Sequence, residues 1–424
     1  MIARRQFIAG AALLPAMLEA GSLAAKPALS PAKLASDETY WQQVASQYEL
    51  PQGITQLENG NWGVMSKPVL DAYFRNQRKV NRESSYYTRR EFGPEWVAVR
   101  KRVADMLGVS ADEIALTRNA TEALQCLIGG YNNLKPGDAV LYADHDYSAM
   151  QSAMDWLRNR RGVDVIRIKL PEPATWQGMI DAYAQALDAN PRVRLILLTH
   201  LGHRSGLVLP VREITEMAAA RGVDAIVDAA HSVGQLDFKL PALGASFVGF
   251  NLHKWIGAPL GVGGFYIAKD RIPDIDPHMA DLDDTSTSIN ARVHSGTANF
   301  AATMTVPDAI DFQEAIGGAT KEARLRHLRN LWAEELRDIQ GLEILTPADP
   351  RLSCGITSFR FSDRRSMADN EAVARELLER FKIFTVARDG LANGACVRVT
   401  PALFNSSDDI VRLTSALRTM SKAA

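Results

Sequence analysis

Two charged residues stand where apolar, strand-like runs end, and their chemistry is complementary. Asp228 follows Ala225-Ile-Val, and Lys254 closes a run that begins at Gly249. Lysines and aspartates are mostly exposed, so either residue alone would be read as a surface or structural group. A lysine forms a Schiff base with an aldehyde, and a carboxylate keeps a pyridine nitrogen protonated. Together the two residues supply what pyridoxal chemistry requires.

A third segment has the features of a phosphate site. Residues 116–124, Leu-Thr-Arg-Asn-Ala-Thr-Glu-Ala-Leu, follow an expected strand and open an expected helix. The N–H groups and positive dipole end of a helix N-terminus favour an anion, and the Thr121 hydroxyl can assist. The same residues are also typical of an ordinary helix N-cap, in which Asn119 or Thr121 accepts from a backbone N–H of the first turn. We favour the phosphate site because this strand end belongs to the same predicted sheet as Asp228.

The elements that must position these groups alternate between β-rich apolar runs and helical patterns. The intervening segments are long enough for crossover helices, which predicts an α/β fold with a mostly parallel seven-stranded sheet. The last two strands are candidates for antiparallel pairing. Ligands of such sheets bind at the carboxyl ends of the strands. The seven predicted strands lie at residues 113–117, 139–142, 163–166, 193–198, 225–228, 247–250 and 263–267.

Changes of pattern divide the chain further. Residues 26–55 form an N-terminal arm, and residues 56–306 form the large α/β domain. In residues 307–424 a long, charged helix precedes short strands and a closing helix, which predicts a smaller α+β C-terminal domain. The sequence has no obvious repeat or flexible linker, so we expect both domains to pack into one unit.

Residues 1–25 have the regions of a signal peptide. Arg4 and Arg5 precede an apolar stretch, residues 8–18, that is too short to span a bilayer, and Ser22-Leu-Ala offers a cleavage site. The arginine pair resembles a twin-arginine export signal, although the Ser/Thr before it and the Lys after it are missing. This segment predicts export of the folded protein by the twin-arginine machinery to the periplasm, with no stable membrane anchor.

Composition restricts the partners. The chain has 48 basic and 49 acidic side chains, and a net charge of −1 provides no field for nucleic acid. Its three cysteines, Cys126, Cys354 and Cys396, form no CxxC pair, so neither a disulfide framework nor a metal site is expected. A small-molecule ligand is the remaining expectation.

The order and spacing of four motifs resemble those of a known family. The motifs are Thr117-x-Asn-Ala-Thr-Glu122, Asp228-Ala-Ala-His231, His253-Lys-Trp255 and Ser295-Gly-Thr297. Together they are similar to class V aminotransferases of fold type I, and within these to the isopenicillin N epimerase-like branch. The resemblance covers about residues 40–420 and implies a pyridoxal 5′-phosphate (PLP) enzyme that forms a homodimer.

The resemblance also implies roles for the cofactor-binding residues. Lys254 becomes the Schiff-base lysine, Asp228 the partner of the pyridine nitrogen, and His231 a neighbour of the phenolic oxygen. His203 stands where relatives often have Asn or Ser beside the same oxygen, so local proton chemistry can differ. The residues implied at the phosphate are Ala120, Thr121, Asn251, His253 and, reaching across to the partner subunit, Thr297.

Three further residues are implied, one at the cofactor face and two at the substrate. His145 is expected to stack on the cofactor face and to serve as an acid or base, with Tyr147 as the competing candidate. Arg398 is expected to grip the substrate α-carboxylate through its planar fork, although a cross-strand salt bridge would also explain it. Asn61, in the glycine-containing loop 59–63, is expected to face the substrate.

These residues predict the cofactor more sharply than the reaction. The leading hypothesis is a PLP-dependent enzyme acting at the α-carbon of an amino acid or peptide-linked amino acid, as an epimerase or aminotransferase. The alternatives are an exported PLP enzyme that tailors a peptide secondary metabolite such as a siderophore, a cysteine desulfurase-like lyase, and a non-catalytic binding protein. Cys396 lies two residues before Arg398 in an expected strand and cannot reach across the site, which disfavours the desulfurase. The intact Lys254 disfavours the binding protein.

Overall fold

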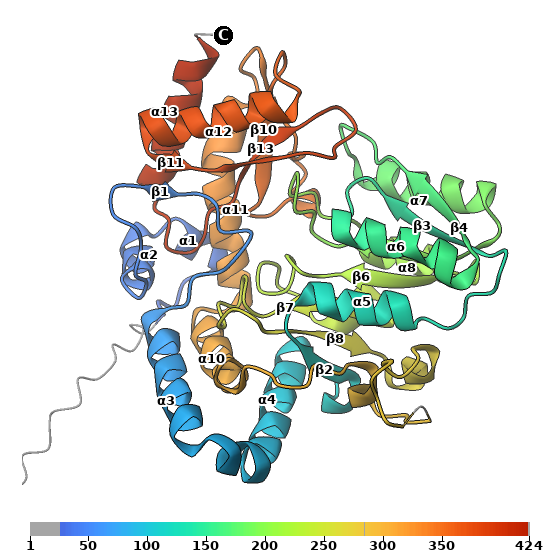
Figure 1. Ribbon diagram of the computed structural model, residues 1–424. Helices are drawn as coiled ribbons and strands as arrows, with labels where there is room; N and C mark the ends of the chain where they lie inside the picture. The colour runs from blue at the N-terminus through green and yellow to red at the C-terminus, as the bar shows by residue number, and fades with distance from the viewer. Residues whose placement is uncertain (1–25, 284, 423–424) are drawn as a thin grey trace, which may run out of the picture.

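The computed structural model describes residues 26–283 and 285–422. Within them a larger α/β domain and a smaller α+β domain lie side by side (Figure 1). The export signal predicted in residues 1–25 lies outside the described residues. Among the described helices, none has the length and apolar character needed to cross a membrane.

All seven predicted strands join one sheet, in the order β2-β8-β7-β6-β5-β3-β4. β8 runs antiparallel to its neighbours β2 and β7, and the other pairs are parallel. The last two strands therefore pair antiparallel with each other, and β8 alone is reversed. The predicted fold class is confirmed. The strands are β2 (Ile114–Thr117), β3 (Ala139–Ala143), β4 (Asp164–Ile168), β5 (Val193–Thr199), β6 (Asp224–Asp228), β7 (Phe247–Asn251) and β8 (Gly263–Ile267).

Helices cover both faces of this sheet because its central strands bury side chains on both sides. In β5, Leu195 and Leu197 join the apolar cluster of α5 and α6, whereas Ile196 and Leu198 join the cluster of α4, α7 and α8. This alternation gives a three-layer domain, with the sheet between two layers of helices. The covering helices are α4 (Phe92–Leu107), α5 (Ala120–Gly130), α6 (Ser148–Arg161), α7 (Trp176–Ala189) and α8 (Val211–Ala219).

The smaller domain is built on a four-stranded antiparallel sheet in the order β12-β13-β10-β9. Its own apolar core includes Trp332 and Phe359, whose rings meet edge to face. Three helices pack on the sheet. The elements are β9 (Leu342–Ile344), β10 (Thr357–Phe361), β12 (Val386–Arg388), β13 (Cys396–Val399), α11 (Gly318–Leu336), α12 (Met367–Phe381) and α13 (Ser407–Ser421).

The N-terminal segment is anchored on the smaller domain. β1 pairs in parallel with β11, and the fully buried Arg324 of α11 donates to the Ala35 carbonyl and to Glu38. The chain after β1 therefore enters the gap between the two domains. The remaining elements are α1 (Pro31–Ala35), α2 (Glu38–Ala45), β1 (Thr55–Gln56), α3 (Lys67–Arg90), α9 (Phe300–Met304), α10 (Val306–Ile316) and β11 (Ile383–Phe384).

Candidate active site

A cavity of about 540 Å³ lies at the carboxyl ends of the parallel strands, between the two domains. The segments after β2, β6 and β7 line it from the larger domain, and β12, β13 and the loop after β1 line it from the other side. This is the edge at which parallel α/β sheets bind ligands. Ten of the sequence-predicted residues meet here: Asn61, Ala120, Thr121, His203, Asp228, His231, Asn251, His253, Lys254 and Arg398.

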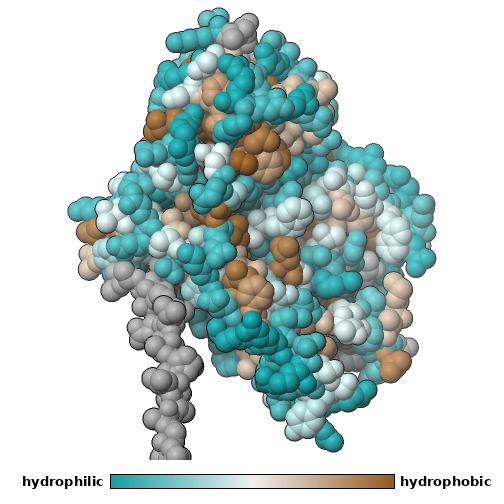
Figure 2. All heavy atoms as spheres, turned by 60° about the vertical axis from the view of Figure 1, so that its left-hand side comes forward, coloured by the Kyte–Doolittle hydropathy of each residue, from teal (hydrophilic) through white to brown (hydrophobic). Residues whose placement is uncertain are grey.

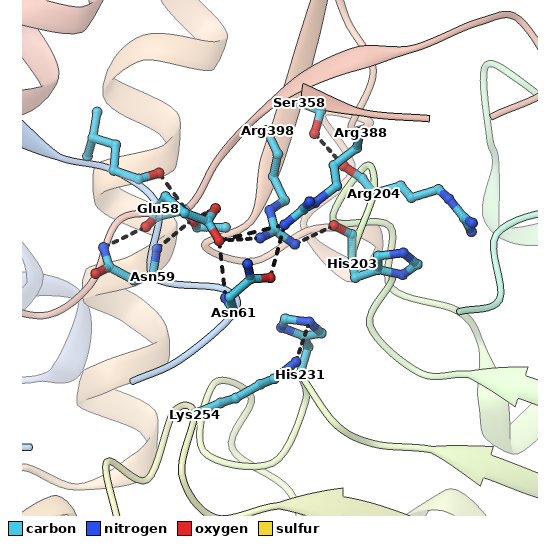
Figure 3. Close-up of polar contacts among 12 residues, drawn as sticks. Glu58, Asn59, Asn61, His203, Arg204, His231, Lys254, Ser358, Arg388 and Arg398 are labelled. Carbon is cyan, nitrogen blue, oxygen red and sulfur yellow. Dashed lines mark hydrogen bonds and ion pairs between the residues drawn. The ribbon is translucent and has the colours of Figure 1, made fainter. Parts of the chain in front are cut away.

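Lys254 lies just after β7, with its amine beside His231. The Lys254 Nζ and the His231 Nε2 are 3.1 Å apart (Figure 3). Burial lowers the pKa of Lys254 to about 8, and the nearby Asp228 carboxylate opposes this shift. The turn is packed tightly, since a Cβ on Gly63 would stand 1.9 Å from the Lys254 carbonyl oxygen. The site thus holds its lysine in place and eases its conversion to the neutral, nucleophilic amine.

Asp228 ends β6 with its carboxylate buried in the cavity wall. Oδ1 accepts a hydrogen bond from the Ala230 N–H at 2.9 Å, while Oδ2 makes no hydrogen bond within the described residues. Burial raises the pKa of Asp228, and the Ala230 N–H and Lys254 act in the opposite direction. An unpaired carboxylate oxygen in such a wall fits the protonated nitrogen of a pyridine ring.

The N-terminus of α5 presents polar groups to the cavity. Asn119 caps the helix by accepting from the Glu122 N–H at 2.8 Å, so the ordinary cap is present as well. The Ala120 N–H donates to Asn251 Oδ1 at 2.8 Å, which occupies that N–H and leaves the Asn251 Nδ2 without a partner among the described residues. His253 Nδ1 donates to the Val262 carbonyl at 3.0 Å, so its Nε2 donates to an anion only when the ring is doubly protonated. With Thr121, these groups suit a phosphate.

The structure distinguishes the two candidates for an aromatic ring on the cavity wall. Tyr147 lines the cavity, is 40% exposed, and meets His203 edge to face with ring centroids 5.1 Å apart. His145 is buried and is not among the residues that line the cavity. Its Nδ1 lies 3.5 Å from the Ser205 hydroxyl, and burial lowers the pKa of His145 to about 4. The placement expected for His145 therefore does not match the geometry, because the loop turns Tyr147 into the cavity instead.

Two arginines from the smaller domain share one carboxylate. Arg398 of β13 is buried, with Nη2 2.6 Å from Glu58 Oε1, and its Nη1 donates to the His203 carbonyl at 2.7 Å. Arg388 of β12 lies 3.7 Å from the same Glu58 oxygen and donates to Asn61 Oδ1 at 3.0 Å (Figure 3). Arg398 is thus neither an exposed cross-strand pair nor an unpartnered cation.

Sequence reasoning missed Glu58 and a second buried carboxylate, Asp146. The Asp146 oxygens accept from the Thr199 hydroxyl at 2.6 Å and from the Ala143 N–H at 2.8 Å, and burial raises the pKa of Asp146 to about 7. Asp146 stands between His145 and Tyr147, so its position in the loop after β3 was the available signal. Glu58 offered none, since its partner Arg398 is 340 residues away in the chain.

The cysteines and Thr297 stand apart from the cavity. Cys396 is buried in β13, and burial raises the pKa of its thiol to about 11. No cysteine of residues 26–283 and 285–422 lines the cavity, so the described site presents no thiolate nucleophile. Thr297 is exposed on the single chain, and its contact with a partner subunit stays a prediction.

Comparisons with known proteins agree with this geometry. The sequence model described as "Aminotransferase class-V" matches residues 66–413. The isopenicillin N epimerase of Amycolatopsis lactamdurans is 30% identical over 402 residues, which cover 91% of this chain and 99% of that protein. The isopenicillin N epimerase of Streptomyces clavuligerus is 26% identical over 393 residues, covering 89% of this chain and 97% of that protein.

Solved structures share the fold at lower identity. The apo cysteine desulfurase of Thermococcus onnurineus NA1 superposes with a TM-score of 0.76 at 20% identity, covering 90% of this chain and 98% of that one. A C-DES mutant with glycine covalently linked to its PLP cofactor gives 0.76 at 21% identity, covering 88% and 98%. The lysine beside His231, the unpaired carboxylate oxygen and the polar helix end all fit PLP. The chain is a PLP-dependent enzyme that belongs to the class V aminotransferase family.

Proposed function

We propose that the protein acts at the α-carbon of an amino acid or peptide-linked amino acid, as an epimerase or an aminotransferase. The observation that carries this proposal is the meeting of Lys254, Asp228 and the Arg388–Arg398 pair around one cavity. When bound, PLP supplies an electron sink that weakens the bonds at the α-carbon of an attached amino acid. The protein must then hold the substrate and move its α-proton.

The larger domain supplies the groups for that proton and for the cofactor. Lys254 would hold the cofactor through its aldehyde, and its neutral amine would accept and return the proton at the substrate α-carbon. Asp228 Oδ2, which has no hydrogen-bond partner among the described residues, would accept from the protonated ring nitrogen. Thr121, Asn251 and His253 hold the phosphate at the N-terminus of α5.

The arginine pair recognises the substrate carboxylate. Arg388 and Arg398 carry two positive charges against the single negative charge of Glu58, so the group keeps one net positive charge for one carboxylate. Charge-assisted bonds from guanidinium groups are strong and directional, and they fix the orientation of the α-carbon. A free amino acid and the carboxyl end of a small peptide both meet this requirement.

Two observations favour α-carbon chemistry of the epimerase type over desulfuration. One isopenicillin N epimerase reaches 30% identity over 99% of its length, whereas the probable cysteine desulfurases reach 24–28%. A desulfurase needs a thiolate that accepts sulfur, whereas Cys396 is buried and burial raises its thiol pKa to about 11. The tailoring of a peptide metabolite remains a specific form of the same proposal.

We also propose a homodimer. Trp62 and Leu260 line the cavity, yet they are 64% and 55% exposed on the single chain. Figure 2 shows further apolar patches across the middle of an otherwise hydrophilic face. A second subunit over the cavity mouth would bury such groups and bring Thr297 toward the partner's phosphate site. Analytical ultracentrifugation tests the dimer, and a monomer at micromolar concentration would count against it.

Export to the periplasm by the twin-arginine machinery completes the proposal. Its support is the Arg4-Arg5 pair and the apolar stretch behind it. Export in the folded state suits an enzyme that takes up its cofactor in the cytoplasm. Fractionation of cells that express the native chain and an Arg4→Lys, Arg5→Lys variant tests this, because only the native chain should reach the periplasm.

The reaction itself is tested by α-hydrogen exchange. The holoenzyme is incubated in D₂O with L- and D-amino acids and with short peptides, while NMR follows loss of the α-proton and chiral chromatography follows the configuration. Exchange with inversion supports an epimerase, and amino-group transfer to a keto acid supports an aminotransferase. Sulfur release from cysteine without either reaction would overturn the proposal.

A further inference from the structure

The residue after the reactive lysine contacts the histidine that faces it. The Trp255 indole Nε1 donates to His231 Nδ1 at 3.3 Å, and on the other side of the ring His231 Nε2 lies 3.1 Å from Lys254 Nζ. The Trp255 and His231 rings are tilted by 60° with centroids 6.5 Å apart, so the contact is made through ring edges. One imidazole therefore joins the indole to the amine.

The chemistry of the three groups fixes the position of the imidazole proton. An indole N–H can only donate, so His231 Nδ1 must accept and cannot carry a proton. A neutral imidazole has one N–H, which then belongs to Nε2. This N–H points to Lys254 Nζ, which can accept it only through the lone pair of a neutral amine. A Lys254 ammonium would face a second donor.

We propose that Trp255 is a positioning residue that holds His231 in its Nε2–H tautomer, so that the imidazole donates to Lys254 Nζ and cannot accept from it. The arrangement favours the neutral amine, which is the form that bonds to an aldehyde. It also leaves a fixed N–H donor, His231 Nε2–H, beside the reactive nitrogen. The inference rests on Lys254 being the reactive lysine of the proposed function.

Burial and the nearby arginines favour the neutral form of both residues. Burial, and then Lys254 and Arg398, hold the pKa of His231 well below its ordinary value, so its neutral form dominates. Around Lys254, burial and the two arginines favour the neutral amine, whereas Asp228 and Glu58 favour the ammonium. The groups that face this pair are Glu58, His203, Asp228, Arg388 and Arg398.

Trp255 is itself held from the opposite side. Lys321 of α11 is buried and its Nζ donates to the Trp255 carbonyl at 3.0 Å. A Cβ on Gly234, where φ is +83°, would lie 2.9 Å from the Trp255 carbonyl carbon. The backbone of Trp255 is thus fixed before its indole reaches His231, as a positioning role requires.

The tautomer can be measured directly in the wild-type protein. The chain has eight histidines, so ¹⁵N-histidine labelling of the full-length protein, with and without PLP, gives few ring signals in long-range ¹H–¹⁵N spectra. His231→Gln identifies the His231 signal. We expect Nε2 protonated and Nδ1 unprotonated from pH 7 to 9. A dominant Nδ1–H form or an equal mixture would overturn the proposal.

A matched pair of tryptophan variants separates the hydrogen bond from packing. Trp255→Phe removes the donor, and Trp332→Phe makes the same change at a fully buried tryptophan whose Nε1 has no partner among the described residues. We expect Trp255→Phe to populate the Nδ1–H tautomer and Trp332→Phe to leave His231 unchanged. Retention of pure Nε2–H in a folded Trp255→Phe variant would also overturn the proposal.

The consequence for Lys254 is read from its reactivity in the PLP-free chain. The pH dependence of labelling by an amine reagent, mapped by mass spectrometry, gives the pKa of Lys254. We expect Trp255→Phe to raise it by about one unit. In the His231→Gln background the same change should have no effect, because the glutamine amide donates without help from Trp255. Equal shifts in both backgrounds would refute the link through His231. None of these readouts requires turnover, so an unexpected reaction would leave them valid.

Discussion

The two walls of the cavity treat charge in opposite ways. On the wall of the larger domain, burial lowers the pKa of Lys254 to about 8 and raises that of Asp228, so both residues move toward their neutral forms. On the opposite wall, Arg398 and Glu58 are both buried and form an ion pair at 2.6 Å.

The two walls differ in whether their ionisable groups have a close partner of opposite charge. A buried ionisable group without a close counter-charge loses its hydration and favours the neutral state, whereas a paired one keeps its charge at a fixed place. The first wall suits proton transfer, which needs groups that change protonation. The second suits recognition, which needs charges that stay. We infer that cofactor chemistry and substrate binding are divided between the domains.

The largest expected effect comes from breaking the ion pair. Arg398→Ala leaves the buried Glu58 without its nearest cation and should lower the free energy of unfolding by about 3–5 kcal/mol. In the same variant we expect weaker substrate binding, on the order of 2–4 kcal/mol. Urea unfolding and KM measure the two effects. Adding Glu58→Gln should restore much of the stability but not the binding, and purely additive losses in the double variant would contradict the pairing.

The wall of the larger domain is tested next by Asp228→Asn. The amide has nearly the same shape but lacks the charge that stabilises a protonated ring nitrogen, so we expect kcat to fall roughly 10- to 150-fold, about 1.5–3 kcal/mol. Asp224→Asn, at the other end of β6, is the control and should retain kcat. Equal kcat in the Asp228→Asn variant and the native enzyme would remove Asp228 from the mechanism.

The comparison also predicts a pH dependence. Because the pKa of Lys254 lies near 8 rather than 10.5, its neutral fraction in the PLP-free chain rises about tenfold per pH unit below pH 8 and levels off above it. The rate of covalent PLP attachment at saturating PLP should follow that curve, measured by stopped-flow absorbance. A rate that keeps rising to pH 10 would show that burial does not favour the neutral amine.

The smallest expected effect is that of Cys396→Ala. The Cys396 thiol is buried in β13 and does not line the cavity, so the rate of α-hydrogen exchange should be unchanged. The free energy of unfolding should fall by about 1 kcal/mol. Loss of turnover in this variant, with the fold intact by circular dichroism, would restore the desulfurase alternative.

Much of the larger-domain wall could be predicted from the sequence because it is local. Each group there follows a strand whose apolar pattern is visible, and parallel strands bring their carboxyl ends to one edge. This reasoning predicts that Asp228 and Lys254 lie at one edge of the sheet. The cap at Asn119 was also predictable, since its signal lies within four residues.

The opposite wall could not be predicted in the same way because its contacts are long-range. Glu58 and Arg398 are 340 residues apart in the chain, and the sequence around either residue does not indicate that the two make contact. The placement of His145 and Tyr147 differs from the expectation for another reason: an irregular loop has no periodicity, so the sequence does not show which side chain turns inward. The contact of Trp255 with His231 depends on how two turns pack, which spacing alone does not give.

The most direct test of the central assignment is borohydride reduction of the purified, PLP-loaded protein followed by peptide mapping. We predict a single pyridoxyl adduct on Lys254, absent from Lys254→Ala. The buried Lys321, whose pKa burial lowers to about 7, provides an internal comparison and should remain unmodified. An adduct on Lys321 or on another lysine, or unchanged labelling of Lys254→Ala, would contradict the account.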